Sequence, residues 1–125
     1  MAAGTLVSSG TSANIPSGSG SERLRRATIH TLNNDWQEIL SGVAGHIYTI
    51  ISIIFTDQQG ASGTIGIRTN NGTADVYIVS SQSHGASETF VWNDKFVLEE
   101  DDDLDVYNSG AQCDWMVSYI DQDWT

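Results

Sequence analysis

The sequence of 125 residues contains a single cysteine, Cys113, and a single proline, Pro16. One cysteine cannot form an internal disulfide, and the usual structural zinc sites need several thiolates, or thiolates together with imidazoles. We therefore expect neither a disulfide framework nor a structural zinc site. Packing and hydrogen bonding must hold the fold together.

Basic residues are also few, with five Lys and Arg against 16 Asp and Glu and a formal net charge of −11. Nucleic-acid phosphates would be repelled by such a protein unless its basic residues formed a local stripe, and the body of the sequence has none. We therefore expect no nucleic-acid partner.

Long apolar runs are absent. The longest, residues 47–55, is about half of what a helix needs to cross a bilayer, and it is rich in β-branched residues, which favour a strand. The first ten residues contain no Lys or Arg and no long apolar run, so we expect no secretory signal peptide and no membrane partner.

Residues 1–22 consist mainly of Ser, Gly, Ala and Thr, with isolated apolar side chains at Leu6, Val7 and Ile15. Such a segment cannot bury enough apolar surface to fold alone. The composition predicts an extended arm over residues 1–25, followed by one domain over residues 26–125.

The domain consists of short β-branched and aromatic runs separated by Gly, Asn, Asp and Ser, which is typical of strands and turns. No stretch predicts a long helix. We expect an all-β, jelly-roll-like antiparallel β-sandwich. Its predicted strands are residues 26–32, 36–40, 46–56, 63–69, 73–81, 87–92, 96–98, 103–108 and 113–121.

The clearest predicted hairpin joins residues 64–69 to residues 74–79 through the turn Asn70-Asn71-Gly72. Asn-Gly readily adopts the positive φ angles that tight hairpin turns require.

Apolar residues alternate with polar ones in the last two predicted strands, so one face of each belongs to the core. These core residues are Leu104, Val106, Cys113, Trp115, Val117 and Tyr119.

The central strand is apolar on both sides if its residues alternate strictly. One side then carries Ile47, Thr49, Ile51, Ile53 and Phe55, and the other carries Tyr48, Ile50, Ser52 and Ile54. The outward side is covered either by an arm or loop of the same chain or by another subunit. The second interpretation makes Tyr48, Ile50 and Ile54 candidates for an oligomer interface.

The four tryptophans raise the possibility of sugar binding, because indole faces stack on sugar rings. Trp115 fits the core by its position in the last strand. Trp36 and Trp92 lie at strand edges, where aromatic residues often anchor interfaces, and Trp124 is expected to dock on its own domain or on a neighbour. We take Trp36, Trp92 and Trp124 as further interface candidates.

Six carboxylates occur within the seven residues 99–105. Their density suggests Ca²⁺, but consecutive acids on extended backbone point in alternate directions. Asp101, Asp102 and Asp103 are therefore only a weak candidate for a cation site, and a solvated acidic turn is the simpler interpretation.

No constellation of catalytic residues stands out. His30, His46 and His84 lie in separate segments, and no phosphate-binding glycine loop or nucleophile elbow is present. We expect no enzymatic activity and no cofactor.

Three of the five basic residues, Arg23, Arg25 and Arg26, lie where the arm meets the domain. They either pair with acidic groups of a partner or neighbouring subunit, or remain solvated.

The C-terminal half resembles small jelly-roll decoration (cement) proteins of tailed bacteriophage capsids. The resemblance rests on the segments FVLEEDDDLDVY (residues 96–107), NSGA (108–111) and DWMVSYID (114–121), with GHIYTIISI (45–53) similar to the early core strand of that family. It covers roughly residues 36–121, and its motifs encode strand geometry rather than chemistry.

The resemblance implies a virion structural protein, made in the bacterial cytoplasm, that sits on the capsid surface as a homo-oligomer, a trimer in particular. Its partners would be the major capsid protein and other copies of itself. The arm residues Leu6, Val7 and Ile15 and the three arginines would then contact the shell. A tail or fibre component that binds a receptor or glycan is the alternative.

Overall fold

The computed structural model of the chain describes residues 21–31, 34–110 and 112–125. All regular secondary structure in these residues is β, and no described helix is long and apolar enough to cross a membrane. The strands are β1 (Ser21–Thr31), β2 (Gln37–Ser41), β3 (His46–Asp57), β4 (Gly63–Asn70), β5 (Asp75–His84), β6 (Thr89–Trp92), β7 (Phe96–Leu98), β8 (Asp103–Asn108) and β9 (Cys113–Asp123).

Every predicted strand is present, with small shifts at the ends. The largest shift is at the start of the domain, because β1 begins at Ser21 and pairs with β9 without interruption, from Ser21 opposite Asp123 to Thr31 opposite Cys113. Residues 21–25 therefore belong to the sandwich and not to the predicted arm. The arm candidates Leu6, Val7 and Ile15 lie outside the described residues.

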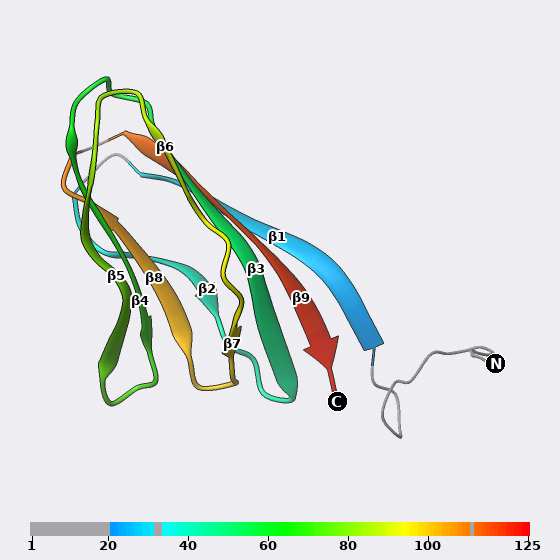
Figure 1. Cartoon of the computed structure of the whole chain (residues 1–125). Coiled ribbons are helices and arrows are strands. Elements are labelled where there is room, and N and C mark those ends of the chain that lie inside the picture. Colours follow the sequence, from blue (N-terminus) through cyan, green and yellow to red (C-terminus); the bar gives the residue numbers. More distant parts are fainter. Residues whose placement is uncertain (1–20, 32–33, 111) are drawn as a thin grey trace.

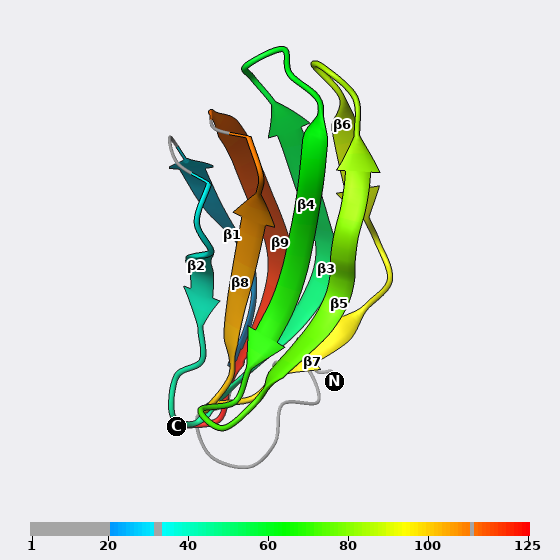
Figure 2. The same ribbon diagram turned by 90° about the vertical axis from the view of Figure 1, so that its left-hand side faces the viewer.

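The strands form two antiparallel sheets packed face to face (Figures 1 and 2). The first sheet has the order β1-β9-β3-β6, with β7 also paired to β3, and the second has the order β2-β8-β4-β5. If β6 and β7 are counted as one interrupted edge strand, eight strands form two four-stranded sheets connected as in a jelly roll. The all-β, jelly-roll-like sandwich is confirmed.

The predicted β4–β5 hairpin is confirmed, but its loop is longer than expected. The strands pair up to Asn70 and Asp75, and Asn71 Oδ1 accepts hydrogen bonds from the backbone N–H groups of Thr73 and Ala74. Gly72 has φ +88°, a value that favours glycine.

The core lies between the sheets, and both sheets contribute to it. Trp115, Phe55, Ile65 and Leu104 are among its fully buried side chains. All six residues that the alternation of the last two strands assigned to the core are buried. The polar residues between them face outward because side chains alternate along a strand.

The strict alternation expected for the central strand is wrong. The register between β3 and β9 shifts between Ile50 and Ser52, and this bulge brings Tyr48, Ile50, Ile53 and Phe55 to the inner face together. Tyr48 and Ile50 are buried in the core and are not interface residues. Ile54 remains on the outer side, half-buried.

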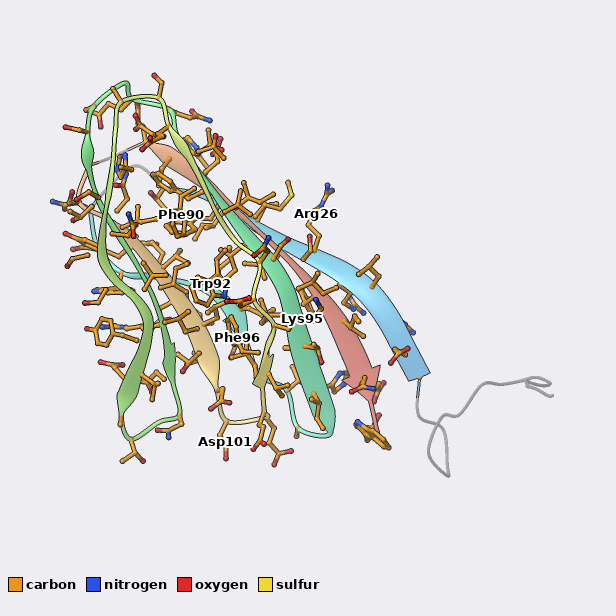
Figure 3. All side chains as sticks on the ribbon, viewed as in Figure 1. Arg26, Phe90, Trp92, Lys95, Phe96 and Asp101 are labelled. Carbon is orange, nitrogen blue, oxygen red and sulfur yellow. The ribbon has the colours of Figure 1, made fainter. Side chains whose placement is uncertain are left out.

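Trp92 is also directed inward. It lies opposite Ile53, packs against the core, and its indole nitrogen is buried. Figure 3 shows Phe90, Trp92 and Phe96 in the space between the sheets, whereas Arg26 points away from it. Trp92 therefore supports the β6 edge of the core and does not offer its indole to a partner.

Candidate assembly faces

The outward side of the first sheet presents three rows of side chains that run across its strands. We call these rows the first outer face. The strand register defines them as Leu24–Ile120–Thr49–Val97, Arg26–Ser118–Ser52 and Thr28–Met116–Ile54–Val91.

The two flanking rows of the first outer face are largely apolar. Leu24 is 74% exposed, Val91 52% and Val97 50%, although nothing in the described chain covers them. An antiparallel sheet with one solvated face normally alternates apolar inward and polar outward residues. Exposed apolar side chains gathered on one face of a small domain are a feature of interaction surfaces, which makes this face a candidate.

The charge of the first outer face is opposite to that of the protein as a whole. Its three rows contain Arg26 and no carboxylate, although the chain carries 16 acids. Carboxylates lie at the two ends of the outward side, where Glu22 bonds Gln122 and Asp114 bonds His30, and the exposed Asp94 lies with Lys95 in the β6–β7 connection at its edge. The middle of this face is thus the part of the first sheet best suited to approach an acidic surface.

A hollow of about 400 Å³ marks one end of this face. The hollow is lined by residues of the Thr28–Met116–Ile54–Val91 row and by polar residues at the adjacent end of the sheet. The lining residues are Thr28, Ile29, His30, Ile54, Thr56, Asp114, Trp115 and Met116. The first outer face is therefore indented here, which allows a protruding side chain of a partner to insert.

The outward side of the second sheet has a different chemistry. We call it the second outer face, and two of its rows follow the register of β2, β8, β4 and β5. These rows are Glu38–Asp105–Arg68–Tyr77 and Ser41–Asp103–Asn70–Asp75. They contain four carboxylates and one guanidinium.

Trp36 covers part of the second outer face. Its ring stacks on Tyr107 with centroids 5.3 Å apart, meets the edge of Tyr77 at 5.8 Å, and lies under the Arg68 guanidinium at 4.0 Å. Gly66 leaves room for it, because a Cβ there would lie 2.7 Å from Trp36 Cη2. The chain itself thus engages the indole, so Trp36 is a half-buried part of the second outer face and does not offer a free ring face for sugar stacking.

The carboxylates of the second outer face crowd one another. Burial, and next the nearby Asp103 and Asp105, raise the pKa of Glu38. Burial also raises the pKa of Asp105, against the effect of Arg68, whose Nε lies 3.3 Å from it. Arg68 Nη1 also lies 3.4 Å from Asp75 Oδ2, so Arg68 forms ion pairs with two of the four carboxylates.

The three arginines at the start of the domain do not act as one cluster. Arg25 Nε is 3.1 Å from the buried Asp121, which also bonds His46 Nδ1 at 2.7 Å. Hydrogen bonds from Thr125 lower the pKa of Asp123, and His46 and then Arg23 add smaller effects in the same direction. Arg26 alone projects from the first outer face (Figure 3).

The acidic turn between β7 and β8 closes one end of the sandwich, where Asp101 lies (Figure 3). Asp102 accepts a hydrogen bond from the backbone N–H of Glu99, and Asp103 accepts one from the Ser41 hydroxyl on the second outer face. Asp101 is exposed to solvent. The three candidate cation ligands thus diverge. Across residues 21–31, 34–110 and 112–125, no three His, Cys, Asp or Glu side chains are grouped to hold a metal ion.

Trp124 lies beside this turn and is 45% exposed. Its backbone N–H donates to Gly45 O at 2.8 Å, so the chain end docks on the domain while the indole stays accessible. The indole borders a hollow of about 650 Å³. The other lining residues are Gly45, His46, Ile47, Asn71, Thr73, Glu99, Glu100, Asp101 and Asp102.

The histidines and the cysteine make structural contacts. His84 Nε2 lies 2.9 Å from Asn108 Oδ1 in the core, and His30 and His46 pair with Asp114 and Asp121. Burial raises the pKa of the Cys113 thiol, which is the opposite of what activates a nucleophile. The absence of enzymatic activity stays a prediction.

The sequence interpretation missed most of the first outer face. Leu24, Val91 and Val97 became part of one surface only through the register of five strands. The signal that could have found them is the presence of apolar residues at outward positions of adjacent strands, such as Leu24 opposite Ile120 and Ile54 opposite Val91.

No protein-family model matches the sequence, and no curated protein matches it significantly. Among solved structures, one from Bacillus endospore appendages, which form a family of disulfide-linked pili, superposes with a TM-score of 0.49 and 16% identity over 90% of this chain and 97% of that chain. One from infectious bursal disease virus, Gx strain, superposes with a TM-score of 0.46 and 8% identity over 83% of this chain and 37% of that chain. Likeness this low says nothing about the function of this chain.

Proposed function

We propose that this chain is a bacteriophage virion structural protein that decorates and stabilises the capsid by binding the shell as a β-sandwich oligomer. The observation that carries the proposal is the first outer face, where Leu24, Val91 and Val97 stay exposed on an otherwise acidic protein. Its partners would be the major capsid protein and further copies of itself in a trimer. It would be made in the host cytoplasm and would then sit on the capsid surface.

The size of the domain supports a role in assembly. A sandwich of about 100 residues removes only about two-thirds of its chain surface from water, so contacts with other subunits add stability that its own core cannot supply. Several modest contacts on one rigid oligomer act together, which gives firm attachment to a repetitive shell.

Binding to particles tests the proposal directly. Purified full-length protein is mixed with shells of the phage that encodes it and sedimented, and its copy number is compared with that of the major capsid protein. Decoration predicts saturable binding at a fixed ratio to shell subunits. Failure to bind shells, or only a few copies per particle, would reject it.

The arm is tested separately by deletion of residues 1–20, because the nine described strands all lie beyond it. If Leu6, Val7 and Ile15 contact the shell, the shortened protein keeps its β circular dichroism spectrum and its oligomeric state but no longer sediments with shells. Normal coating by the shortened protein would show that the arm is not the attachment.

A tail or fibre component that binds a glycan is the alternative, and one observation favours it: the accessible Trp124 indole beside a hollow lined by carboxylates and Asn71. Such a hollow would accept a sugar through stacking and hydrogen bonds. Glycan-array binding that is lost in Trp124→Ala and kept in Trp36→Ala would support this alternative. No binding to any glycan would count against it.

A further inference from the structure

We propose that copies of this chain assemble through unlike faces, the first outer face of one copy docking on the second outer face of the next. The inference rests on the proposed function, since it specifies how the oligomer is built. The exposed apolar face of one copy is thus covered by a second copy of this chain, which contacts it with the outward side of its second sheet.

Charge complementarity is the first argument. The rows of the first outer face carry Arg26 and no carboxylate, whereas the rows of the second carry four carboxylates and only Arg68. Arg68 pairs with Asp75 and Asp105, and within the described chain no cation pairs with Glu38 or Asp103. An incoming Arg26 would supply the missing cation.

The state of the carboxylates agrees with this pairing. Burial, with Asp103 next in effect, raises the pKa of Glu38 on a monomer surface. An arginine from a neighbour would favour the ionised form of both groups, so docking relieves their mutual repulsion. Arginine also suits this contact because its planar group can bridge two carboxylates.

The apolar parts of the two faces also match. Leu24, Val91 and Val97 of the first face need an apolar surface, and the second face offers the ring cluster of Trp36, Tyr77 and Tyr107, with Tyr77 half exposed. Aromatic residues are enriched and carboxylates depleted at the centres of protein interfaces. The rings would therefore form the centre of the contact and the acids its rim.

Docking of like faces is less favourable on the same grounds. Two first outer faces would bring their Arg26 rows together with no carboxylate between them, and two second outer faces would oppose four carboxylates with four more. Contact between unlike faces is heterologous, and it generates a closed ring when the rotation between copies closes and a filament when it does not. Because the two faces lie on opposite sides of the sandwich, untilted contacts of this kind stack copies in a row, and a closed ring requires a tilt between neighbouring copies (Figure 2).

Sedimentation velocity of the full-length protein over a range of concentrations tests the arrangement with two charge reversals. Arg26→Glu disables the first face and Glu38→Arg the second, and each is expected to weaken self-association by about tenfold or more. Mixed in equal amounts, the two variants should associate again into alternating rows or even-numbered rings, because positions 26 and 38 carry opposite charges in both contacts between unlike variants. A closed trimer cannot alternate and would recover only in part. High salt should weaken assembly of the wild type.

Two control variants change charge away from both faces. Asp101→Arg, in the acidic turn, and Thr73→Glu, in the β4–β5 loop, should leave self-association unchanged. Circular dichroism confirms that each variant is folded. A wild type that stays monomeric at all concentrations, a Glu38→Arg variant that assembles normally, or a mixture that stays dissociated would each overturn the inference.

Shell binding separates this inference from the proposed function. If wild-type protein coats shells but the mixture does not recover self-association, the unlike-face contact is wrong and decoration stands. If the variants and their mixture behave as expected but no form binds shells, the contact stands and decoration is wrong.

Discussion

The two sheets of the sandwich share one core, yet their outward sides differ in how far the chain itself satisfies them. On the second sheet, Trp36 and Arg68 form a ring and ion-pair network that covers Gly66 and engages two carboxylates. On the first sheet no comparable segment among residues 21–31, 34–110 and 112–125 covers Leu24, Val91 or Val97. The inner faces explain why the chain folds, and the difference between the outer faces is the basis of the assembly proposed above.

The largest expected effect comes from removing the core that both sheets share. Trp115→Ala should lower the free energy of unfolding by about 4 kcal/mol, because a fully buried indole leaves a cavity between the sheets. Urea unfolding followed by circular dichroism measures it. Met116→Ala, one residue away on the first outer face, is the matched control and should cost well under 1 kcal/mol.

Asp57 joins the sheets at one end, and its removal should have the next largest effect. The buried carboxylate accepts backbone N–H groups from Gln59, Gly60, Ala61 and Ser87, in the connections that lead from the first sheet to the second and back. Asp57→Ala should lower the free energy of unfolding by about 3 kcal/mol at neutral pH, since four donors lose their acceptor.

The same carboxylate gives a pH dependence whose sign is fixed. Burial alone would raise the pKa of Asp57, but the four backbone hydrogen bonds outweigh it and lower the pKa. Its contribution to stability is therefore complete above the unfolded pKa of about 3.9 and is lost as the pH falls through the lower folded value. Urea midpoints from pH 7 to pH 2 should fall less steeply in Asp57→Asn than in the wild type; parallel curves would contradict this assignment.

Trp36 tests whether the second outer face is satisfied within the chain. Trp36→Ala should cost about 2 kcal/mol, because it removes the stack on Tyr107 and the contact with Arg68. Gly66→Ala should also destabilise the wild type, since the added Cβ collides with the indole, but should do so far less in the Trp36→Ala background. Equal costs in both backgrounds would show that the indole does not depend on Gly66.

The sequence predicted the strands and much of the core because short-range alternation and turn residues determine both. All nine strands were found, and residues such as Leu104 and Val117 are buried as expected. Alternation failed in β3, where one bulge reverses the side on which later residues lie. The exchange of Ile53 and Ile54 between core and surface cannot be read from a period of two.

The surfaces were harder to predict because they depend on residues far apart in the chain. Trp36 was taken as an interface candidate because it lies at a strand edge, but Gly66 and Arg68, about thirty residues later in the chain, make room for its ring and pack on it. The first outer face joins Leu24 to Ile120 through strand pairing alone. The charge difference between the faces likewise follows from which strands share a sheet.

The smallest expected effect on stability is paired with a large one on association. Leu24 is 74% exposed at the β1 edge, so Leu24→Ser should change the free energy of unfolding by no more than about 0.5 kcal/mol. If the first outer face is buried in the oligomer, the same substitution should weaken self-association, because an apolar anchor has become polar, whereas Leu24→Met should assemble normally. Urea unfolding and sedimentation velocity on the same samples measure both quantities. Unchanged association in Leu24→Ser would place the contact elsewhere and leave the exposed apolar rows of the first sheet without a role in assembly.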